Sequence, residues 1–277
     1  MVIFKKEFTM FKFENKTVVV VGGTSGINLG IARCFAKAGA KVAVVSRSQD
    51  KVDAAVEELK ALGANSMGVS ADVRHFEELV NAMDSFKDSF GEFDVLVSGA
   101  AGNFPARAMD MSANAFASVI NIDLLGTFHV MKAAYPHLKK PGASVINISA
   151  PQSYIAADFQ SHVCSAKAGV DMLTKNLARE WGSEGVRVNS VVPGPIEATE
   201  GMSRLAPTKA LQDAIVDNVP LGRNGTHEDI GNCCMFLSSQ FASYISGVIL
   251  PVDGAWSLGG YSVSMNAMQN IMSKPQK

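Results

Sequence analysis

The sequence predicts a doubly wound α/β domain in which seven parallel strands alternate with helices. The first observation is the run Thr17–Val21, which is β-branched and apolar on both faces, as a strand buried inside a parallel sheet requires. The second is the glycine turn, helix and strand that follow this run at once. The third is the continued alternation of strand and helix patterns to residue 252. With 277 residues, 47% of them hydrophobic, the chain suffices for one large core.

Each further element follows from the spacing of its apolar residues. The first helix carries Ile27, Ile31 and Phe35 at helical spacing and ends at Gly39. Further helices are predicted over residues 50–62, 76–90, 113–137, 158–181 and 228–238, and further strands over residues 42–45, 66–70, 93–97, 143–149, 186–192 and 248–252. The stretch 197–220 departs from this alternation and is a candidate substrate lid.

Small residues gather where the predicted strands end. Because ligands of open α/β sheets bind outside the carboxyl ends of the strands, we expect one long cofactor groove along these residues. They are Gly22, Ala71, Ser98 to Gly102, Ser149, Pro193 and Gly194.

The turn from Gly22 to Gly26 joins a strand to the start of a helix, which is the arrangement of a phosphate site. Free backbone N–H groups and the positive end of the helix dipole both face an anion in such a turn. We therefore expect Gly22, Thr24, Ser25, Gly26 and Ile27 to bind a dinucleotide. The alternative is a purely structural turn.

The residues after the second strand favour NADP(H) over NAD. A carboxylate there would accept the ribose hydroxyls of NAD, whereas an Arg pairs with the 2′-phosphate of NADP. The chain has Arg47 and Ser48 there, and no acid before Asp50. Arg47 carries a planar, permanently charged fork suited to phosphate, although it could also be an ordinary solvated charge. Asp72 is a candidate partner of the adenine amino group or, alternatively, a helix cap.

The composition argues against several classes of protein. The net charge of −1 disfavours nucleic acid or an anionic membrane as the main partner, and no apolar run reaches the length of a membrane span. The four cysteines lack metal-ligand spacing, so no metal is expected, and they indicate reduced intracellular thiols, buried in the case of Cys34, Cys233 and Cys234. We expect a cytoplasmic protein with a leader over residues 1–16. Translation of the protein could also start at Met10. One cofactor-binding domain should follow over residues 17–256, and a tail or subunit contact over residues 257–277.

Several motifs resemble those of the short-chain dehydrogenase/reductases, a family with the Rossmann fold. They are Val21-Gly22-Gly23-Thr24-Ser25-Gly26, Ala71-Asp72-Val73, Ser165-Ala166-Lys167-Ala168, Arg187-Val188-Asn189, Pro193-Gly194 and Val252-Asp253-Gly254, in family order and at family spacing. The resemblance implies a nicotinamide-dependent oxidoreductase with a small-molecule substrate, commonly a tetramer built across the two long helices. It also implies cofactor contacts at Val73, Ala100, Lys167, Pro193, Gly194, Ile196 and Thr199.

Two parts of the sequence depart from the family pattern. The third turn glycine of the family falls on Asn28, so the cofactor turn should differ locally. The catalytic Tyr of the family, one helical turn before Lys167, falls on Val163, and the family's serine falls on Ala150, next to Ser149. Because a valine can neither give nor take a proton, the usual mechanism, in which a Tyr protonates a carbonyl oxygen, is not expected.

Within the family, the sequence resembles the 2,4-dienoyl-CoA reductases, which lack that Tyr. Ala100-Ala101-Gly102-Asn103-Phe104 is similar to their signature after the fourth strand. Asn121-Ile122-Asp123, followed by Gly126-Thr127-Phe128, resembles the peroxisomal type in particular. The proposed acid–base pair of that type falls on Asp123 and Lys167. The Tyr that the mitochondrial type uses instead falls on Gln152, so that variant is not matched.

The resemblance implies hydride transfer from NADPH to the far end of a conjugated dienoyl thioester, followed by protonation at carbon. Asn103 would donate a hydrogen bond to the thioester oxygen, and Lys167 would hold the nicotinamide ribose and favour the anionic intermediate. Asp123 would orient a water or pass on a proton, and Ser149, or Ser165, would hold a water or the substrate. Alternatively, Asp123 belongs to a structural polar network or a subunit contact, and Asn103 is an ordinary turn residue.

Two other functions compete with this one. A 3-oxoacyl or other ketone reductase of the same family would need Tyr154 to replace the missing Tyr. A cofactor-binding protein without turnover would agree with Val163, although Asp123 and Lys167 argue against it. Residues that could line an acyl pocket, or be plain packing, are Phe104, Met109, Met111, Met202 and Leu205. The chain length of the substrate, its carrier and the physiological direction do not follow from the sequence.

Overall fold

The computed structural model describes residues 11–199, 202, 206, 208–261 and 263–264 of the chain. Its centre is a seven-stranded sheet in which all neighbouring strands are parallel, in the order β3-β2-β1-β4-β5-β6-β7. This confirms the predicted doubly wound parallel sheet. The strands are β1 (Thr17–Val21), β2 (Lys41–Ser46), β3 (Ser66–Ser70), β4 (Val95–Ser98), β5 (Ser144–Ile148), β6 (Arg187–Pro193) and β7 (Ile249–Val252).

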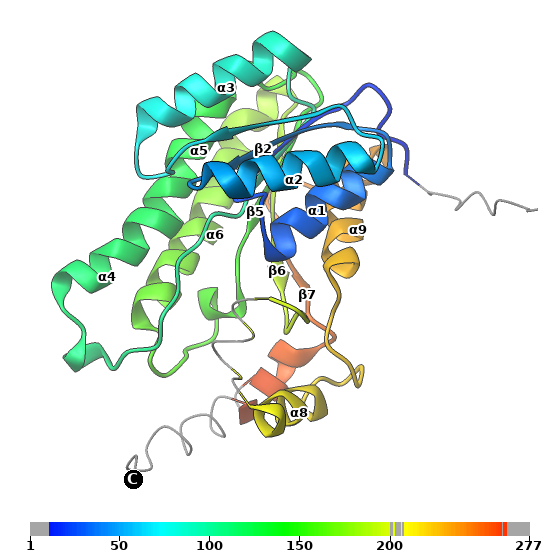
Figure 1. The fold of residues 1–277 in the computed structure, drawn as a ribbon. Helices are drawn as coiled ribbons and strands as arrows, with labels where there is room; N and C mark the ends of the chain where they lie inside the picture. The colour runs from blue at the N-terminus through cyan, green and yellow to red at the C-terminus, as the bar shows by residue number, and fades with distance from the viewer. Residues whose placement is uncertain (1–10, 200–201, 203–205, 207, 262, 265–277) are drawn as a thin grey trace, which may run out of the picture.

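Helices cover both faces of the sheet (Figure 1). Helices α1 (Gly26–Lys37), α2 (Gln49–Ala61) and α9 (His227–Ser238) pack on one face, where they meet Val18 and Val20 of β1. Helices α3 (Phe76–Phe90), α5 (Gly126–Ala134) and α6 (Ser161–Trp181) pack on the other, where they meet Val19 and Val21. Because successive side chains of a strand point to opposite faces, this β-branched strand is buried on both sides.

The helix predicted over residues 113–137 is divided into segments. α4 (Ala113–Val119) passes into a π-helical segment, η2 (Ile120–Leu125), which continues into α5 and then into the 3-10 turn η3 (Tyr135–His137). Single π-helical turns inside α-helices are rare and occur frequently at functional sites. Asp123 lies in this turn and is buried, so the change of helical pitch coincides with a predicted site residue. The other 3-10 turns are η1 (Ala108–Asp110), η4 (Pro151–Ser153), η5 (Gly182–Glu184), η6 (Gln240–Ala242) and η7 (Trp256–Leu258).

The predicted leader, lid and tail are only partly described. Residues 1–10, including Met10, lie outside the described residues, whereas Phe13 is buried against Phe35 at a ring-centroid distance of 4.8 Å. Of the lid, residues 200–201, 203–205 and 207 lie outside, and α8 (Lys209–Asp217) is described. Of the tail, residues 262 and 265–277 lie outside, while Trp256 packs edge-on against Tyr261. No helix among the described residues is long and apolar enough to cross a membrane.

Candidate active site

Two adjoining cavities follow the carboxyl ends of the strands. The first, the turn cavity, has a volume of about 230 Å³ and holds seven of the predicted cofactor residues: Gly22, Thr24, Ser25, Arg47, Asp72, Val73 and Ala100. The second, the deep cavity, has a volume of about 330 Å³ and holds the others except Ser48: Gly26, Ile27, Lys167, Pro193, Gly194, Ile196 and Thr199. Ser48 is the N-cap residue of α2 and lines neither cavity.

The glycine turn has the backbone geometry of an anion site. Gly22 and Gly26 have φ angles of +79° and +52°, in the left-handed region that glycine adopts without strain. Ser25 is the N-cap of α1, and its side chain makes no capping hydrogen bond. The first N–H groups of α1 therefore remain available to a ligand at the positive end of the helix dipole. A dinucleotide pyrophosphate fits this turn.

Asn28 braces the turn where the family has a glycine. Its Nδ2 donates a hydrogen bond of 2.7 Å to the carbonyl of Gly99, at the end of β4. A Cβ atom on Gly99 would clash with this amide, so the two turns fit only because residue 99 has no side chain. Asn28 lines both cavities, and it therefore lies at the junction of the groove.

Arg47 and Asp72 both line the turn cavity, but they differ in exposure and in their ion pairs. Arg47 is exposed, with Lys51 of α2 on the same cavity wall. The Asp72 carboxylate accepts hydrogen bonds from the side chain and the backbone N–H of Arg74. The Arg74 hydrogen bond is the main cause that lowers the pKa of Asp72 to about 2. The N-cap of α3 is His75, so Asp72 is not the cap of that helix, and its carboxylate is already bound to a cation.

A buried ion pair joins Asp123 and Lys167 in the deep cavity. Asp123 Oδ2 lies 3.3 Å from Lys167 Nζ, with the two side chains 1% and 7% exposed. Asp123 Oδ1 accepts the backbone N–H of Gly102 at 2.7 Å, and Lys167 Nζ donates to the carbonyl of Ile148 at 3.1 Å. Charges out of water are tolerated only when paired and hydrogen-bonded. The pair therefore ties η2 and α6 to the turn after β4 and to the end of β5.

The position of the family Tyr is apolar. Val163 is buried in a cluster with Val119 and Ala166, against Phe104, and it also lines the deep cavity. Tyr154 is half-exposed and is not among the residues that line either cavity. Burial of its ring raises the pKa of Tyr154, and Ser257 is its hydrogen-bonding neighbour. No tyrosine among the described residues thus faces Lys167 from the cavity wall.

Other polar residues share the deep cavity with the ion pair. Asn103, Ser149 and Gln152 all line it. Ser165, the other candidate serine, is exposed and donates to the carbonyl of Ser161 on its own helix. Of the residues that were candidates for an acyl pocket, Met202 lines the deep cavity, Phe104 packs behind Val163, Met109 is exposed and Leu205 lies outside the described residues.

Several lining residues were not predicted from the sequence. Lys51 lies in the first turn of α2, four residues after Arg47. Ile215 of α8 and Trp256 close the deep cavity from segments far along the chain, and no local pattern signals such contacts. Gln152 was noted only as the place of a missing Tyr.

The thiols take no part in the site. Burial raises the pKa of Cys34 and of Cys233 to about 11 and also raises that of Cys234, so all three thiols stay protonated and unreactive near neutral pH. Cys34 and Cys234 are buried as predicted, whereas Cys233 is only partly buried. The four cysteines are free. Within the described residues, no three His, Cys, Asp or Glu side chains come together as metal ligands.

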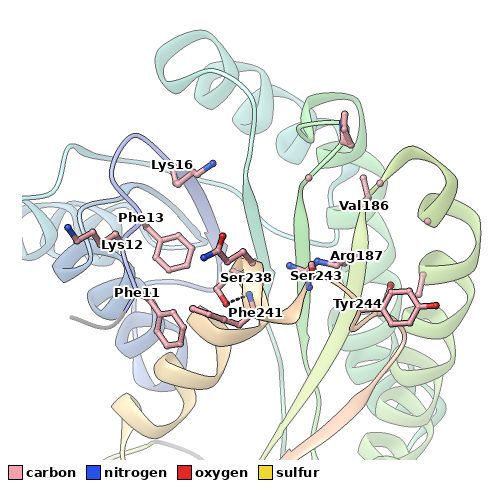
Figure 2. Close-up of a pocket in the computed structure, with 18 residues that line it drawn as sticks. Phe11, Lys12, Phe13, Lys16, Val186, Arg187, Ser238, Phe241, Ser243 and Tyr244 are labelled. Carbon is pink, nitrogen blue, oxygen red and sulfur yellow. Dashed lines mark hydrogen bonds between the residues drawn. The ribbon is translucent and has the colours of Figure 1, made fainter. Parts of the chain in front are cut away.

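A third cavity, whose volume of about 1000 Å³ exceeds those of the turn and deep cavities, lies among described residues at the opposite end of the sheet (Figure 2). Phe11 and Phe13 line one side of it, Val186 and Arg187 at the start of β6 the other, and Phe241 lies next to Phe11. It contains none of the predicted catalytic or cofactor residues. Size alone therefore does not identify the active site of this protein.

The chain is similar to known proteins over most of its length. Residues 21–257 match the family model described as enoyl-(acyl carrier protein) reductase. A peroxisomal 2,4-dienoyl-CoA reductase of Arabidopsis thaliana, named as producing (3E)-enoyl-CoA, is 40% identical over 87% of the chain and 84% of the relative. A protein of Bacillus subtilis named a probable 2,4-dienoyl-CoA reductase, producing (2E)-enoyl-CoA, is 35% identical over 90% and 99%.

Among solved structures, a short chain dehydrogenase from Bacillus anthracis is 36% identical, with a TM-score of 0.78 over 87% of this chain and 96% of that one. The sequence motifs, the sheet order and these likenesses lead to one assignment. The chain belongs to the short-chain dehydrogenase/reductase family, resembles its 2,4-dienoyl-CoA reductases, and is an oxidoreductase that uses a nicotinamide cofactor.

Proposed function

We propose that the protein is an NADPH-dependent reductase of 2,4-dienoyl-CoA thioesters. The observation that carries this proposal is the buried pair of Asp123 and Lys167 beside the apolar Val163. A ketone reductase needs an acid next to the carbonyl oxygen, and Val163 cannot serve. The curated relatives that share about 40% identity are named for dienoyl-CoA reduction, which supports the same substrate class.

The reduced nicotinamide, when bound, supplies a hydride to the far carbon of the conjugated diene. The charge then develops on the thioester oxygen, where a hydrogen-bond donor stabilises it. Asn103 is our candidate donor, since it lines the deep cavity next to the Gly102 N–H that Asp123 holds. Lys167 adds a positive charge in a buried setting, where electrostatic interactions are stronger than in water.

Asp123 positions both Asn103 and Lys167. Its Oδ1 fixes the turn that carries Asn103, and its Oδ2 keeps the Lys167 ammonium in place. The proton finally goes to carbon, by way of water. Protonation next to the thioester yields a (3E)-enoyl product, the product named for the Arabidopsis relative.

We assign the preference for NADP(H) to Arg47. Arg47 and Lys51 are the cations of the turn cavity, and a 2′-phosphate would bind such a pair through charge-assisted hydrogen bonds. Asp72 would not repel this phosphate strongly, because Arg74 neutralises its carboxylate.

A coupled assay tests the function. NADPH oxidation is measured with 2,4-hexadienoyl-CoA, with a 3-oxoacyl-CoA and without substrate, and the enoyl product is identified by NMR. We expect oxidation with the dienoyl thioester and a (3E)-enoyl product. Oxidation with the 3-oxoacyl thioester alone would favour the ketone reductase that uses Tyr154. Cofactor binding without turnover of either thioester would favour a protein that only binds the cofactor.

We also propose a homotetramer formed across α5 and α6. Exposed apolar side chains on the π-helical segment, α5 and α6, namely Leu125, Phe128 and Met172, would be covered in such a contact. Light scattering of the purified protein measures the assembly directly. The cytoplasmic location and the division into leader, domain 17–256 and tail stay predictions.

A further inference from the structure

Two buried polar atoms of the deep cavity have no hydrogen-bond partner among the described residues. Ser149 and Gln152 line this cavity and are 4% and 9% exposed. Ser149 Oγ and Gln152 Oε1 make no hydrogen bond with any described residue. Leaving such an atom unpaired costs about 1–3 kcal/mol, and buried polar atoms are therefore nearly always paired with protein or ordered water. Both atoms thus require a partner inside the cavity.

The nitrogen of the Gln152 side-chain amide is held by a hydrogen bond to Gln160. Its Nε2 donates to Oε1 of Gln160 at 2.7 Å, and Gln160 is itself 1% exposed at the start of α6. With its nitrogen held there, Gln152 offers its oxygen, which only accepts hydrogen bonds. A thioester oxygen and an acyl chain have no proton to donate, whereas water has two. Between water and the acyl thioester, water is therefore the partner that suits Gln152.

Lys167 completes the set of groups that a water would need. Its ammonium donates to the carbonyl of Ile148, the residue before Ser149, and pairs with Asp123. An ammonium has three N–H donors, so these two contacts leave one for a ligand. Ser149 Oγ and Gln152 Oε1, which line the same cavity, would supply two of the two to four polar partners that a buried water requires, and this N–H would supply a third when it is not bound to the cofactor. The cavity volume of about 330 Å³ is well above the roughly 30 Å³ that one water occupies in the liquid.

We infer that Ser149 and Gln152 bind the water molecule that protonates the substrate carbon, which rests on the proposed dienoyl reductase function. After hydride transfer the substrate is a dienolate. An electron pair of the dienolate forms a C–H bond at the carbon next to the thioester, with a proton from this water. The O–H electron pair stays on the oxygen as hydroxide. The Lys167 ammonium gives a proton to the hydroxide, which restores water, and regains one from solvent.

The test compares Gln152→Met, Gln152→Glu and Ser149→Ala with the wild type, using 2,4-hexadienoyl-CoA and NADPH in H₂O and D₂O. Met keeps the volume of Gln but accepts no hydrogen bond, so Gln152→Met and Ser149→Ala should lower kcat roughly 10–100-fold, within the range of lost proton-transfer catalysis. Both should raise the solvent isotope effect on kcat and leave the KM for NADPH unchanged. Gln152→Glu keeps an accepting oxygen but loses the hydrogen bond to Gln160, so its kcat should lie between those of Gln152→Met and the wild type. Gln160→Met, which frees the amide, should have a smaller effect than Gln152→Met.

Ser153→Ala is the matched control, because Ser153 Oγ is also buried without a partner but does not line the cavity. It should keep the wild-type kcat and isotope effect. A Gln152→Met variant with wild-type kcat and isotope effect overturns the inference. A variant that unfolds at a lower temperature but keeps the wild-type kcat and isotope effect overturns it as well. If the wild type itself does not reduce the dienoyl thioester, the proposed function fails and the protonation step fails with it. A high-resolution crystal structure gives a readout without turnover: a water between Ser149 Oγ and Gln152 Oε1 is expected, and its absence overturns the site.

Discussion

The two cavities of the groove are built from different kinds of group. The turn cavity is shaped by backbone, with glycines at residues 22 and 99 and the Asn28 amide between them. The deep cavity depends on a few buried side chains, with the pair of Asp123 and Lys167 at its centre. We therefore expect cofactor binding to be sensitive to added volume in the turn cavity, and the chemistry to be sensitive to single side chains of the deep cavity, such as Val163 at the position of the family Tyr.

The largest effect is expected from breaking the ion pair. Lys167→Met should lower kcat roughly 10³-fold, because a charge that stabilises the transition state is lost. It should also lower the free energy of unfolding by about 3–5 kcal/mol, since Asp123 would remain charged and unpaired in a buried site. Steady-state kinetics and denaturant unfolding measure the two effects.

The double variant Asp123→Asn/Lys167→Met separates the effect on turnover from the effect on stability. Asn keeps an oxygen for the Gly102 N–H and removes the unpaired charge, so stability should return while turnover does not. Lys175→Ala, at an exposed position on the same helix, serves as the control and should change neither quantity. A double variant that regains turnover would show that the pair is structural.

The second prediction concerns the backbone of the turn cavity. Gly99→Ala places a methyl group against the Asn28 amide, an overpacking that should cost about 1–3 kcal/mol. Because the cofactor turns must move apart, the Kd for NADPH should rise about 10-fold, equal to 1.4 kcal/mol. Fluorescence titration with NADPH measures the change.

Asn28→Gly should rescue Gly99→Ala, because it removes the amide that the new methyl group meets. Gly182→Ala is the matched control: its φ is −59°, and an added Cβ meets no heavy atom within 4 Å. That variant should bind NADPH as the wild type does. Additive effects of the two substitutions in a double-mutant cycle would show that Asn28 does not brace this turn.

The fold was predictable because it depends on patterns that are local in sequence. The buried β-branched run Thr17–Val21 and the glycine turn after it set the strand, turn and helix that begin the sheet. The π-helical turn at Ile120–Leu125 was not predictable, since the apolar spacing there resembles that of an ordinary helix. Its position depends on the tertiary contacts of Asp123 with Gly102 and Lys167.

The candidate site was predictable where a motif carried it and not where distant segments meet. Asn103, Asp123, Ser149 and Lys167 do come together in one cavity. The state of Asp72, bound by Arg74, depends on side-chain geometry that residue type does not reveal. Trp256 reaches the cavity from the last turn of the domain, beyond any local periodicity.

The third prediction sharpens the assignment of the cofactor to the turn cavity. Arg47→Ala should raise the KM for NADPH roughly 10-fold, since a hydrogen bond to a charged group contributes about 1.5–3 kcal/mol, and should leave the KM for NADH unchanged. The KM of Arg47→Lys for NADPH should lie between those of the wild type and Arg47→Ala, because the Lys ammonium is a point charge without the planar fork of Arg. Equal changes for both cofactors would mean that Arg47 does not bind the 2′-phosphate.

The smallest effect is expected at Tyr154, the residue that would turn the deep cavity into an ordinary ketone-reducing site. Its ring is half-exposed, lines neither cavity and has Ser257 as its hydrogen-bonding neighbour. Tyr154→Phe removes only the hydroxyl, so kcat with a dienoyl thioester should stay within about twofold of the wild type, the range of an exposed substitution. Because burial raises the pKa of this phenol, it stays protonated near neutral pH, and the pH profile of kcat should not change either. A loss of turnover as large as that in Lys167→Met would place the acid of the reaction on Tyr154 and favour the ketone reductase.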